Sequence, residues 1–194
     1  PYLTPVFDGK GSIPKVDADW IRACPDAYCN IRDPDLLSRI LPGFDQETTD
    51  FYRWKVGYSF SEVAELVHTH TGIDLGGNLR LISLDRGMSG RIVKLRIEGS
   101  CGAVNIGKEL EIRRVLSPSH LYSSAFVAEP NPGGITLIGA GWGHGVGLCQ
   151  IGAGVMGLKG FSYEKILEHY YPGTSIRKAS SEIGSEDTAK EPGG

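Results

Sequence analysis

The chain has 194 residues, enough for one substantial hydrophobic core, and its 40% hydrophobic and 22% charged residues are typical of a globular domain. The net charge of −3 argues against nucleic acid as a partner, and no apolar stretch approaches the roughly 18 residues that a membrane span requires. Glycine is the unusual residue, with 27 positions, about twice its average share, which indicates many turns and close backbone approaches.

The first part of the chain is predicted to be loop, followed by a helix and a strand. Residues 1–32 contain several turn formers and few periodic runs, which is typical of a loop with short strands. Residues 34–41 are expected to form a short helix, because Asp33 precedes them as an N-cap and a proline occupies the first helical position. Residues 51–58 are rich in aromatic and other strand-forming residues, so a strand is predicted there.

The middle of the chain carries a capped helix and a hairpin. Ser59 and Glu62 form a capping box, and apolar residues follow at helical spacing up to Gly72. Residues 79–85 and 91–98 alternate apolar and polar side chains on either side of a glycine-containing turn, which predicts a β-hairpin.

The last part of the chain alternates further strands and helices. The predicted elements are a helix at 108–116, strands at 123–128 and 134–141, and a last helix at 162–170. Residues 179–194 are rich in Ser, Glu, Lys, Pro and Gly and are expected to be a disordered polar tail after one domain at 1–178. Consecutive hairpins favour antiparallel pairing, so the expected fold class is α+β, with a mixed, largely antiparallel sheet and several short helices.

Glycines alternate with other residues near the end of the last predicted strand. From Gly139 to Gly147 every odd position is glycine, so an extended chain has one bare face. Trp142, His144 and Val146 then project from the other face. An indole suits the C–H surface of a sugar ring, and an imidazole hydrogen-bonds or transfers a proton near neutral pH. A tightly packed strand with a buried tryptophan and a core histidine fits the same spacing.

A nucleotide-binding motif is considered and excluded. Residues 152–157 match the glycine pattern of a dinucleotide-binding turn, which opens a long helix and has an acidic residue about 20 positions later. Gly160 interrupts the following segment, and residues 172–178 contain no acid. No cofactor is therefore expected.

The cysteines and histidines do not form a pattern of metal ligands, so no metal site is expected. His68 and His70 are two positions apart on a predicted helix and point about 200° away from each other. Cys24 and Cys29 are separated by four residues, at the upper end of the usual zinc spacing of two to four, but no second pair accompanies them. A disulfide between these two cysteines, as in exported proteins, and two free thiols remain the alternatives.

Several segments resemble the stage II sporulation protein D family, which includes the amidase enhancer proteins. Residues 141–153 and 163–174 resemble the end of that family, residues 1–8 resemble a middle segment, and 107–126 fit the stretch between. The resemblance covers about residues 1–178, and the Trp-Gly-His-Gly-Val-Gly run is its most specific part.

The resemblance implies a lytic transglycosylase that acts on peptidoglycan glycan strands from which an amidase has removed the stem peptides. One carboxylic acid protonates the glycosidic oxygen and then accepts the proton of the muramic acid 6-hydroxyl, which closes a 1,6-anhydro ring. The family's catalytic glutamate is expected upstream of Pro1, so no residue of this chain is assigned that role. The acids Asp45, Glu47 and Asp50 are expected to form a solvated turn.

The site expected in this chain is a glycan subsite. Trp142 and His144 are assigned to it as substrate-binding residues, together with Gly143, Gly145 and Gln150. The alternative is a non-catalytic module that binds murein or activates an amidase. Both functions place the protein outside the cytoplasm, in the cell envelope, with glycan strands and a cell-wall amidase as expected partners.

Overall fold

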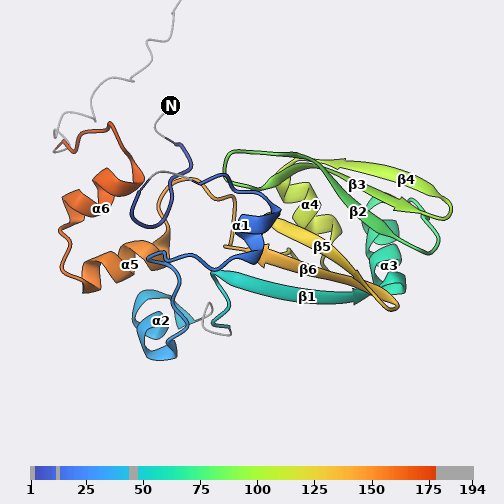
Figure 1. The fold of residues 1–194 in the computed structure, drawn as a ribbon, viewed down its shortest axis with the longest axis horizontal. Helices are drawn as coiled ribbons and strands as arrows, with labels where there is room; N and C mark the ends of the chain where they lie inside the picture. The colour runs from blue at the N-terminus through green and yellow to red at the C-terminus, as the bar shows by residue number, and fades with distance from the viewer. Residues whose placement is uncertain (1–2, 12–13, 44–47, 178–194) are drawn as a thin grey trace, which may run out of the picture.

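The computed structural model describes residues 3–11, 14–43 and 48–177. Within these ranges the chain forms six helices and two antiparallel three-stranded sheets, which confirms the predicted α+β class (Figure 1). The expected polar tail at 179–194 lies outside the described residues.

The first sheet has the order β1-β6-β5, formed by β1 (Arg53–Ser59), β6 (Gly134–Ala140) and β5 (Phe126–Asn131). Trp54 of β1 lies opposite Gly139 of β6. A Cβ atom at Gly139 would lie 2.0 Å from the Trp54 ring, so the buried indole occupies the space that a side chain would need. The pairing of a large ring with a glycine fixes the register of these two strands.

The second sheet has the order β2-β3-β4, formed by β2 (Arg80–Arg86), β3 (Ile92–Gly99) and β4 (Gly102–Gly107). The first two strands are the predicted hairpin. The third strand was not predicted, because most of its residues are exposed or half-buried and only Ile106 is buried. A strand that buries so little carries a weak alternation signal.

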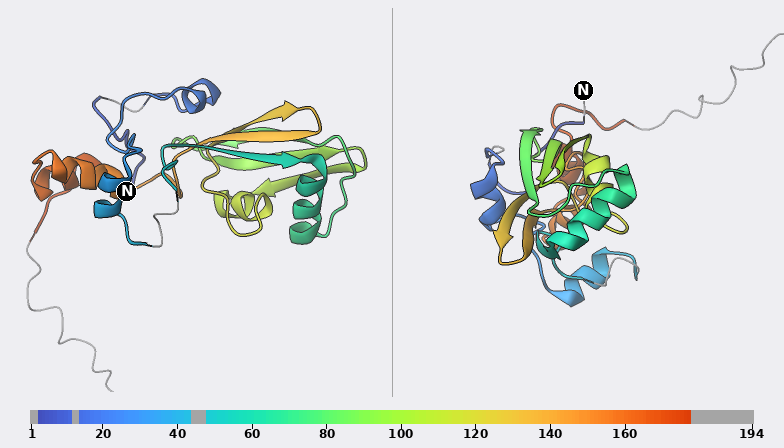
Figure 2. Two further views of the ribbon diagram at one scale, coloured as in Figure 1. Left: turned by 90° about the horizontal axis from the view of Figure 1, so that it is seen from below. Right: turned by 90° about the vertical axis from the view of Figure 1, so that its right-hand side faces the viewer.

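Two helices complete the main core. α3 (Phe60–Thr71) has the predicted capping box at Ser59 and ends at Gly72, whose φ of 73° is left-handed. It lies beside α4 (Glu109–Val115), and Figure 2 shows both helices on one side of the sheets. Side chains from both sheets and both helices are buried together, among them Trp54, Val63, Val67, Leu95, Ile97, Ile112, Phe126 and Leu137.

A short helix covers the other face of the first sheet. α1 (Ala18–Arg22) buries Ile21 against Ala125, Val127 and Ala140. Most of the described residues before position 33 are loop, as predicted, but the expected short strands were wrong, since these residues form this helix and no strand. A five-residue helix is too short to show a periodic apolar pattern.

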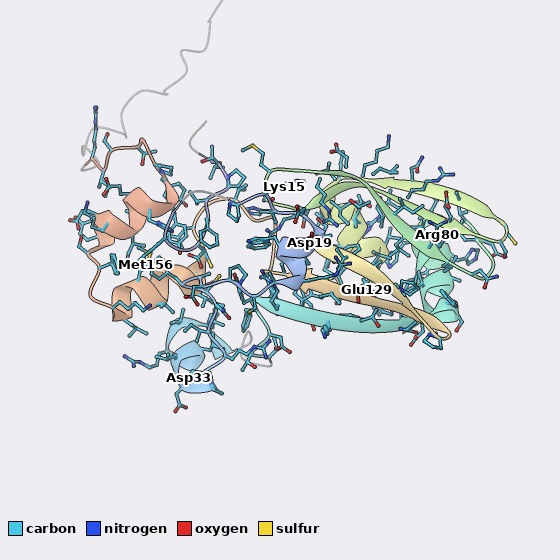
Figure 3. The ribbon with its side chains drawn as sticks, in the orientation of Figure 1. Lys15, Asp19, Asp33, Arg80, Glu129 and Met156 are labelled. Atoms are coloured by element: carbon cyan, nitrogen blue, oxygen red, sulfur yellow. The ribbon has the colours of Figure 1, made fainter. Side chains whose placement is uncertain are left out.

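Three helices form a smaller group at one end of the molecule, which is at the left of Figure 1. They are α2 (Pro34–Ile40), α5 (Gln150–Leu158) and α6 (Tyr163–Tyr170). The buried side chains of α2 and α5 pack with Phe51. Figure 3 shows Met156 of α5 in this group, whereas Arg80 and Glu129 mark the sheets toward the other end.

The helix α5 was not predicted because three of its nine residues are glycine. Two of these glycines allow close contacts. A Cβ atom at Gly152 would lie 2.2 Å from Asp8 Oδ1, and one at Gly154 would lie 2.7 Å from the Ile40 side chain. Packing therefore overrides the low helix propensity. None of the helices in the described part of the chain is long and apolar enough to cross a membrane.

Candidate functional site

The segment between β6 and α5, residues 141–149, is here called the glycine loop. Strand β6 ends at Ala140, and the next four odd positions have left-handed backbones, with φ values of 65° at Gly141, 67° at Gly143, 75° at Gly145 and 77° at Gly147. The extended arrangement considered from the sequence is therefore wrong. The alternating glycines let the chain turn at every second residue, which other residues do not do without strain.

The guanidinium of Arg91 fills the inside of the glycine loop. Its Nε donates a hydrogen bond to the carbonyl of Gly143 at 3.2 Å, and its two Nη atoms donate to the carbonyls of Ser89 (3.0 Å) and Trp142 (3.4 Å). A Cβ atom at Gly145 would lie 2.3 Å from Arg91 Cζ. Burial lowers the pKa of Arg91 to about 10, so the group remains charged at neutral pH. The bare side of the loop thus packs on a cation of the same chain.

Backbone and indole hydrogen bonds attach the glycine loop to strand β1 and to the segments that precede β1 and β5. Trp54 Nε1 donates to the carbonyl of Gly141 at 3.0 Å, and Gly141 N donates to Tyr52 O at 3.1 Å. Gly143 N donates to Tyr122 O at 2.9 Å. These bonds fix where the loop side chains are presented.

Trp142 belongs to a group of three rings, here called the aromatic shelf (Phe51, Tyr122 and Trp142). Its indole stacks on Tyr122 with ring centroids 4.8 Å apart and planes 13° apart. Phe51 lies against it at 4.5 Å with a tilt of 47°. The tryptophan is still 37% exposed. The shelf therefore holds the indole in place while leaving part of its apolar surface accessible.

His144 is exposed, and its Nδ1 accepts a hydrogen bond from Val146 N at 3.2 Å. The neutral imidazole therefore carries its proton on Nε2, which is its hydrogen-bond donor. Gln150 is the first residue of α5 and is exposed. These side chains, together with Trp142, Gly143 and Gly145, line one cavity of about 440 Å³. The structure thus brings all five expected substrate-binding residues together.

The cavity lining also combines aromatic rings with a second cation. The guanidinium of Arg53 lies 4.4 Å from the ring centre of Trp20 and 4.1 Å from that of Tyr52. Burial lowers the pKa of Arg53 and raises that of Tyr52 to about 12, so the arginine is charged and the phenol neutral at pH 7. Arg53 and Arg91 give the cavity two cations, against the single carboxyl group of Asp8 in its lining.

The same cavity lining contains one carboxyl group and two thiols that sequence reasoning did not bring together. Asp8, Cys29 and Cys149 place their side-chain ligand atoms within 4.8 Å of one another, and this group is here called the thiol–carboxylate cluster. Tyr170 Oη donates to Asp8 Oδ1, and Cys29 N donates to Asp8 Oδ2 at 2.8 Å. The three members come from distant parts of the sequence, so spacing gave no signal for them.

Residues 1–147 match the family model described as a domain of unknown function, DUF8618. The chain belongs to this family.

The chain is also similar to curated cell-wall-related proteins. Stage II sporulation protein D of Bacillus amyloliquefaciens is 42% identical over 79 residues, which cover 41% of this chain and 23% of that protein. Stage II sporulation protein D of Bacillus subtilis (strain 168) is 38% identical with the same coverage, and the amidase enhancer of that strain is 32% identical over 91 residues, 43% of this chain and 13% of the enhancer. These matches confirm the resemblance to the stage II sporulation protein D family. The chain spans less than a quarter of the length of each of these relatives.

Electrostatics keep part of the thiol–carboxylate cluster protonated in this DUF8618 member. The neighbouring Cys149 side chain and burial raise the pKa of Cys29. Burial and the adjacent Asp8 raise the pKa of Tyr170. Both groups are therefore uncharged at neutral pH, and the Tyr170 hydroxyl remains a donor to the carboxylate.

Of the cysteines and acids considered from the sequence, Cys29 lines the cavity, whereas Cys24 and Asp50 do not. Cys24 is an exposed free thiol whose Sγ lies 3.7 Å from Asn30 Oδ1, and Cys29, also free, has Cys149 as its sulfur neighbour. The disulfide between Cys24 and Cys29 stays a prediction. Asp50 is exposed and forms an ion pair with Arg32 at 3.7 Å, whereas the acids at positions 45 and 47 lie outside the described residues.

Proposed function

We propose that this chain forms the glycan-binding part of a peptidoglycan lytic transglycosylase that cleaves denuded glycan strands. The catalytic acid is supplied upstream of Pro1. The observation that carries the proposal is the cavity of about 440 Å³, whose lining includes both of the exposed residues Trp142 and His144. The similarity to stage II sporulation protein D and the amidase enhancer supports the choice of peptidoglycan.

The aromatic shelf suits a pyranose ring. The accessible part of the Trp142 indole offers an apolar surface to the C–H face of the sugar. Because Tyr122 and Phe51 already hold the indole, binding a glycan orders few additional side-chain torsions. A preorganised ring of this kind favours binding of a flexible polysaccharide.

The polar groups of the cavity suit the substituents of a denuded strand. Nε2 of His144 and the amide of Gln150 are donors for hydroxyl and acetamido oxygens. Removal of a stem peptide by an amidase leaves a carboxylate on each muramic acid lactyl group. The cations of Arg53 and Arg91 complement that negative charge, which favours a denuded strand over one that still carries peptides.

The test uses the parent protein with its upstream segment and measures binding to denuded glycan strands. Trp142→Ala is expected to weaken binding about tenfold, since one aromatic contact contributes roughly 1.4 kcal/mol. The matched control is Tyr163→Ala, which removes a 64% exposed ring of α6 outside the cavity and is expected to leave binding unchanged. Equal affinity of wild type and Trp142→Ala refutes the assignment of the glycan site.

A second candidate is a non-catalytic module that activates an amidase, and the similarity to an amidase enhancer favours it. Mass spectrometry of denuded glycan after incubation with the parent protein separates the two. Anhydro-ended products identify the transglycosylase. Intact glycan together with an increased rate of an added cell-wall amidase identifies the activator. Either function requires export to the cell envelope, which we propose as the location.

A further inference from the structure

We propose that the thiol–carboxylate cluster of Asp8, Cys29 and Cys149 binds a zinc ion. The site is independent of the glycan-binding proposal, because it uses different residues and a different ligand.

The distances in the cluster suit a tetrahedral ion. The three ligand atoms lie within 4.8 Å of one another. Zn–S bonds of about 2.3 Å and Zn–O bonds of about 2.0–2.2 Å place the ligand atoms of a tetrahedral site roughly 3.5–3.8 Å apart. Each pair therefore needs to close by at most about 1.3 Å, which small side-chain rotations achieve.

The donor types select the metal. Two thiolates and one carboxylate are common ligands of Zn²⁺. The hard cations Mg²⁺ and Ca²⁺ prefer sites made only of oxygen atoms, and sulfur donors disfavour them. Two cysteines with one aspartate thus match zinc better than either of these ions.

Hydrogen bonds already orient each side of the site, as the outer partners of metal ligands do. Both oxygens of Asp8 are held, one by Tyr170 Oη and the other by Cys29 N. Cys149 is the N-cap of the nine-residue helix α5, and its Sγ accepts from Gly152 N at 3.4 Å.

A glycine makes room for this arrangement. A Cβ atom at Gly152 would lie 2.2 Å from Asp8 Oδ1 and 2.3 Å from Tyr170 Oη. The carboxylate and the phenol can therefore pack against the first turn of α5 only because residue 152 has no side chain. The close approach explains why a glycine occupies a buried helical position, where it lowers helix propensity.

The charge of the cluster also favours a cation. With both thiols ionised, three negative charges share a half-buried space in which the ligand atoms are no more than 4.8 Å apart. A divalent cation between them replaces this repulsion by attraction. Binding therefore releases thiol protons, as expected for zinc–thiolate sites.

The ion would connect three segments, two of which lie outside helices and strands. Asp8 and Cys29 lie in the N-terminal loop regions, and Cys149 joins the glycine loop to α5. Three protein ligands leave the fourth tetrahedral position for water. Since all three residues line the cavity that contains Trp142 and His144, the ion fixes one wall of that cavity.

The test measures metal binding by the reduced full chain, without any glycan. Zinc titrated against a chromophoric chelator is expected to bind with a stoichiometry of about one, and Co²⁺ is expected to give near-ultraviolet absorption from thiolate ligation. Cys29→Ser and Cys149→Ser are expected to lose both signals. The control variants Cys24→Ser and Cys101→Ser change exposed thiols outside the cluster and are expected to keep them. Tyr170→Phe is expected to weaken zinc affinity roughly 10- to 100-fold.

Absence of zinc uptake by the reduced wild-type chain overturns the proposal without reference to any variant. Retention of the cobalt absorption by Cys29→Ser and Cys149→Ser, with an unchanged circular dichroism spectrum, also overturns it. A Cys29–Cys149 disulfide found by peptide mapping, combined with no zinc uptake after reduction, identifies a redox pair in place of a metal site. Loss of glycan binding by Trp142→Ala bears on the glycan proposal alone.

Discussion

The sheet body and the glycine-loop end of this molecule are built on different principles. The body, made of the two sheets with α3 and α4, buries a continuous apolar core with ordinary strand and helix patterns. The other end, made of the glycine loop, α2, α5 and α6, has a smaller apolar core, and its arrangement depends on contacts of Arg91, Asp8 and Tyr170 with glycines. The first region therefore tolerates changes on its surface, whereas the second depends on a few polar contacts.

The largest effect is expected where the two regions meet, at Trp54. Its side chain is 2% exposed in the body core, and its Nε1 donates to the carbonyl of Gly141 in the glycine loop. Trp54→Ala is expected to lower the free energy of unfolding by about 3–5 kcal/mol, measured by urea denaturation. The control Leu84→Ala removes a side chain of β2 that is 47% exposed and is expected to cost less than about 1 kcal/mol. Similar costs for the two variants contradict the core position of Trp54.

The body was predictable from sequence because its signals are local. The capping box at Ser59 and the hairpin around residues 86–91 each depend on neighbours within a few positions. Such patterns determine element type without knowledge of the rest of the chain. The strand β4 was missed because it buries only Ile106.

The candidate site was predictable only in part. The alternating glycines pointed to Trp142 and His144, and both residues line one cavity, but the backbone of this segment is looped and not extended as considered from the sequence. Arg91 and the partners of Cys149 gave no signal, because their contacts join positions that are distant in sequence. Periodicity reports which face of an element is buried, and it carries no information about a side chain that supports a remote loop.

Substitution of Arg91 tests whether the stability of the glycine loop can be lowered without changing that of the sheet body. Arg91→Met is expected to leave the carbonyls of Ser89, Trp142 and Gly143 without their donor and to destabilise the glycine loop by about 2–3 kcal/mol. Hydrogen exchange is expected to accelerate at the loop amides while the amides of β3 and β6 keep their protection.

Arg96→Met is the matched control, because Arg96 lies in β3, the strand that follows Arg91, and forms an ion pair with Glu98 on the more exposed side of that strand. It is expected to change exchange in the glycine loop by less than twofold. Uniform acceleration across both sheets in Arg91→Met would mean that the two regions are not separate in stability.

Alanine substitutions at Gly143 and Gly145 test whether the Arg91 guanidinium packs inside the glycine loop. Both have left-handed backbones, so alanine at either position costs roughly 1–2 kcal/mol of strain. A Cβ at Gly143 meets nothing within 4 Å, whereas one at Gly145 lies 2.3 Å from Arg91 Cζ. Gly145→Ala is therefore expected to cost about 1 kcal/mol more than Gly143→Ala in thermal unfolding, because the guanidinium must move and lose hydrogen bonds. Equal costs contradict the packing of Arg91 inside the loop.

The smallest effects on stability are expected from substitutions of the helix N-caps, one in each region. In the body, Ser59 accepts from Glu62 N at 3.2 Å, and the Glu62 carboxylate accepts from Ser59 N at 2.7 Å, which completes the capping box of α3. In the other region, Ser162 caps α6 with one bond of 3.4 Å to Lys165 N. Ser59→Ala is expected to cost about 1 kcal/mol, and Ser162→Ala is expected to cost less in global unfolding, since α6 lies outside the main core.

The capping box of α3 adds a pH dependence that Ser59→Ala removes. Hydrogen bonds from the Ser59 backbone and side chain lower the pKa of Glu62. The contribution of this carboxylate is complete above its ordinary pKa of 4.5 and is lost as pH falls through the lower folded value. The stability difference between wild type and Ser59→Ala, measured by urea denaturation, is therefore expected to shrink below pH 4.5. A difference for Ser59→Ala that stays constant down to pH 3 would show that Glu62 does not act through the cap.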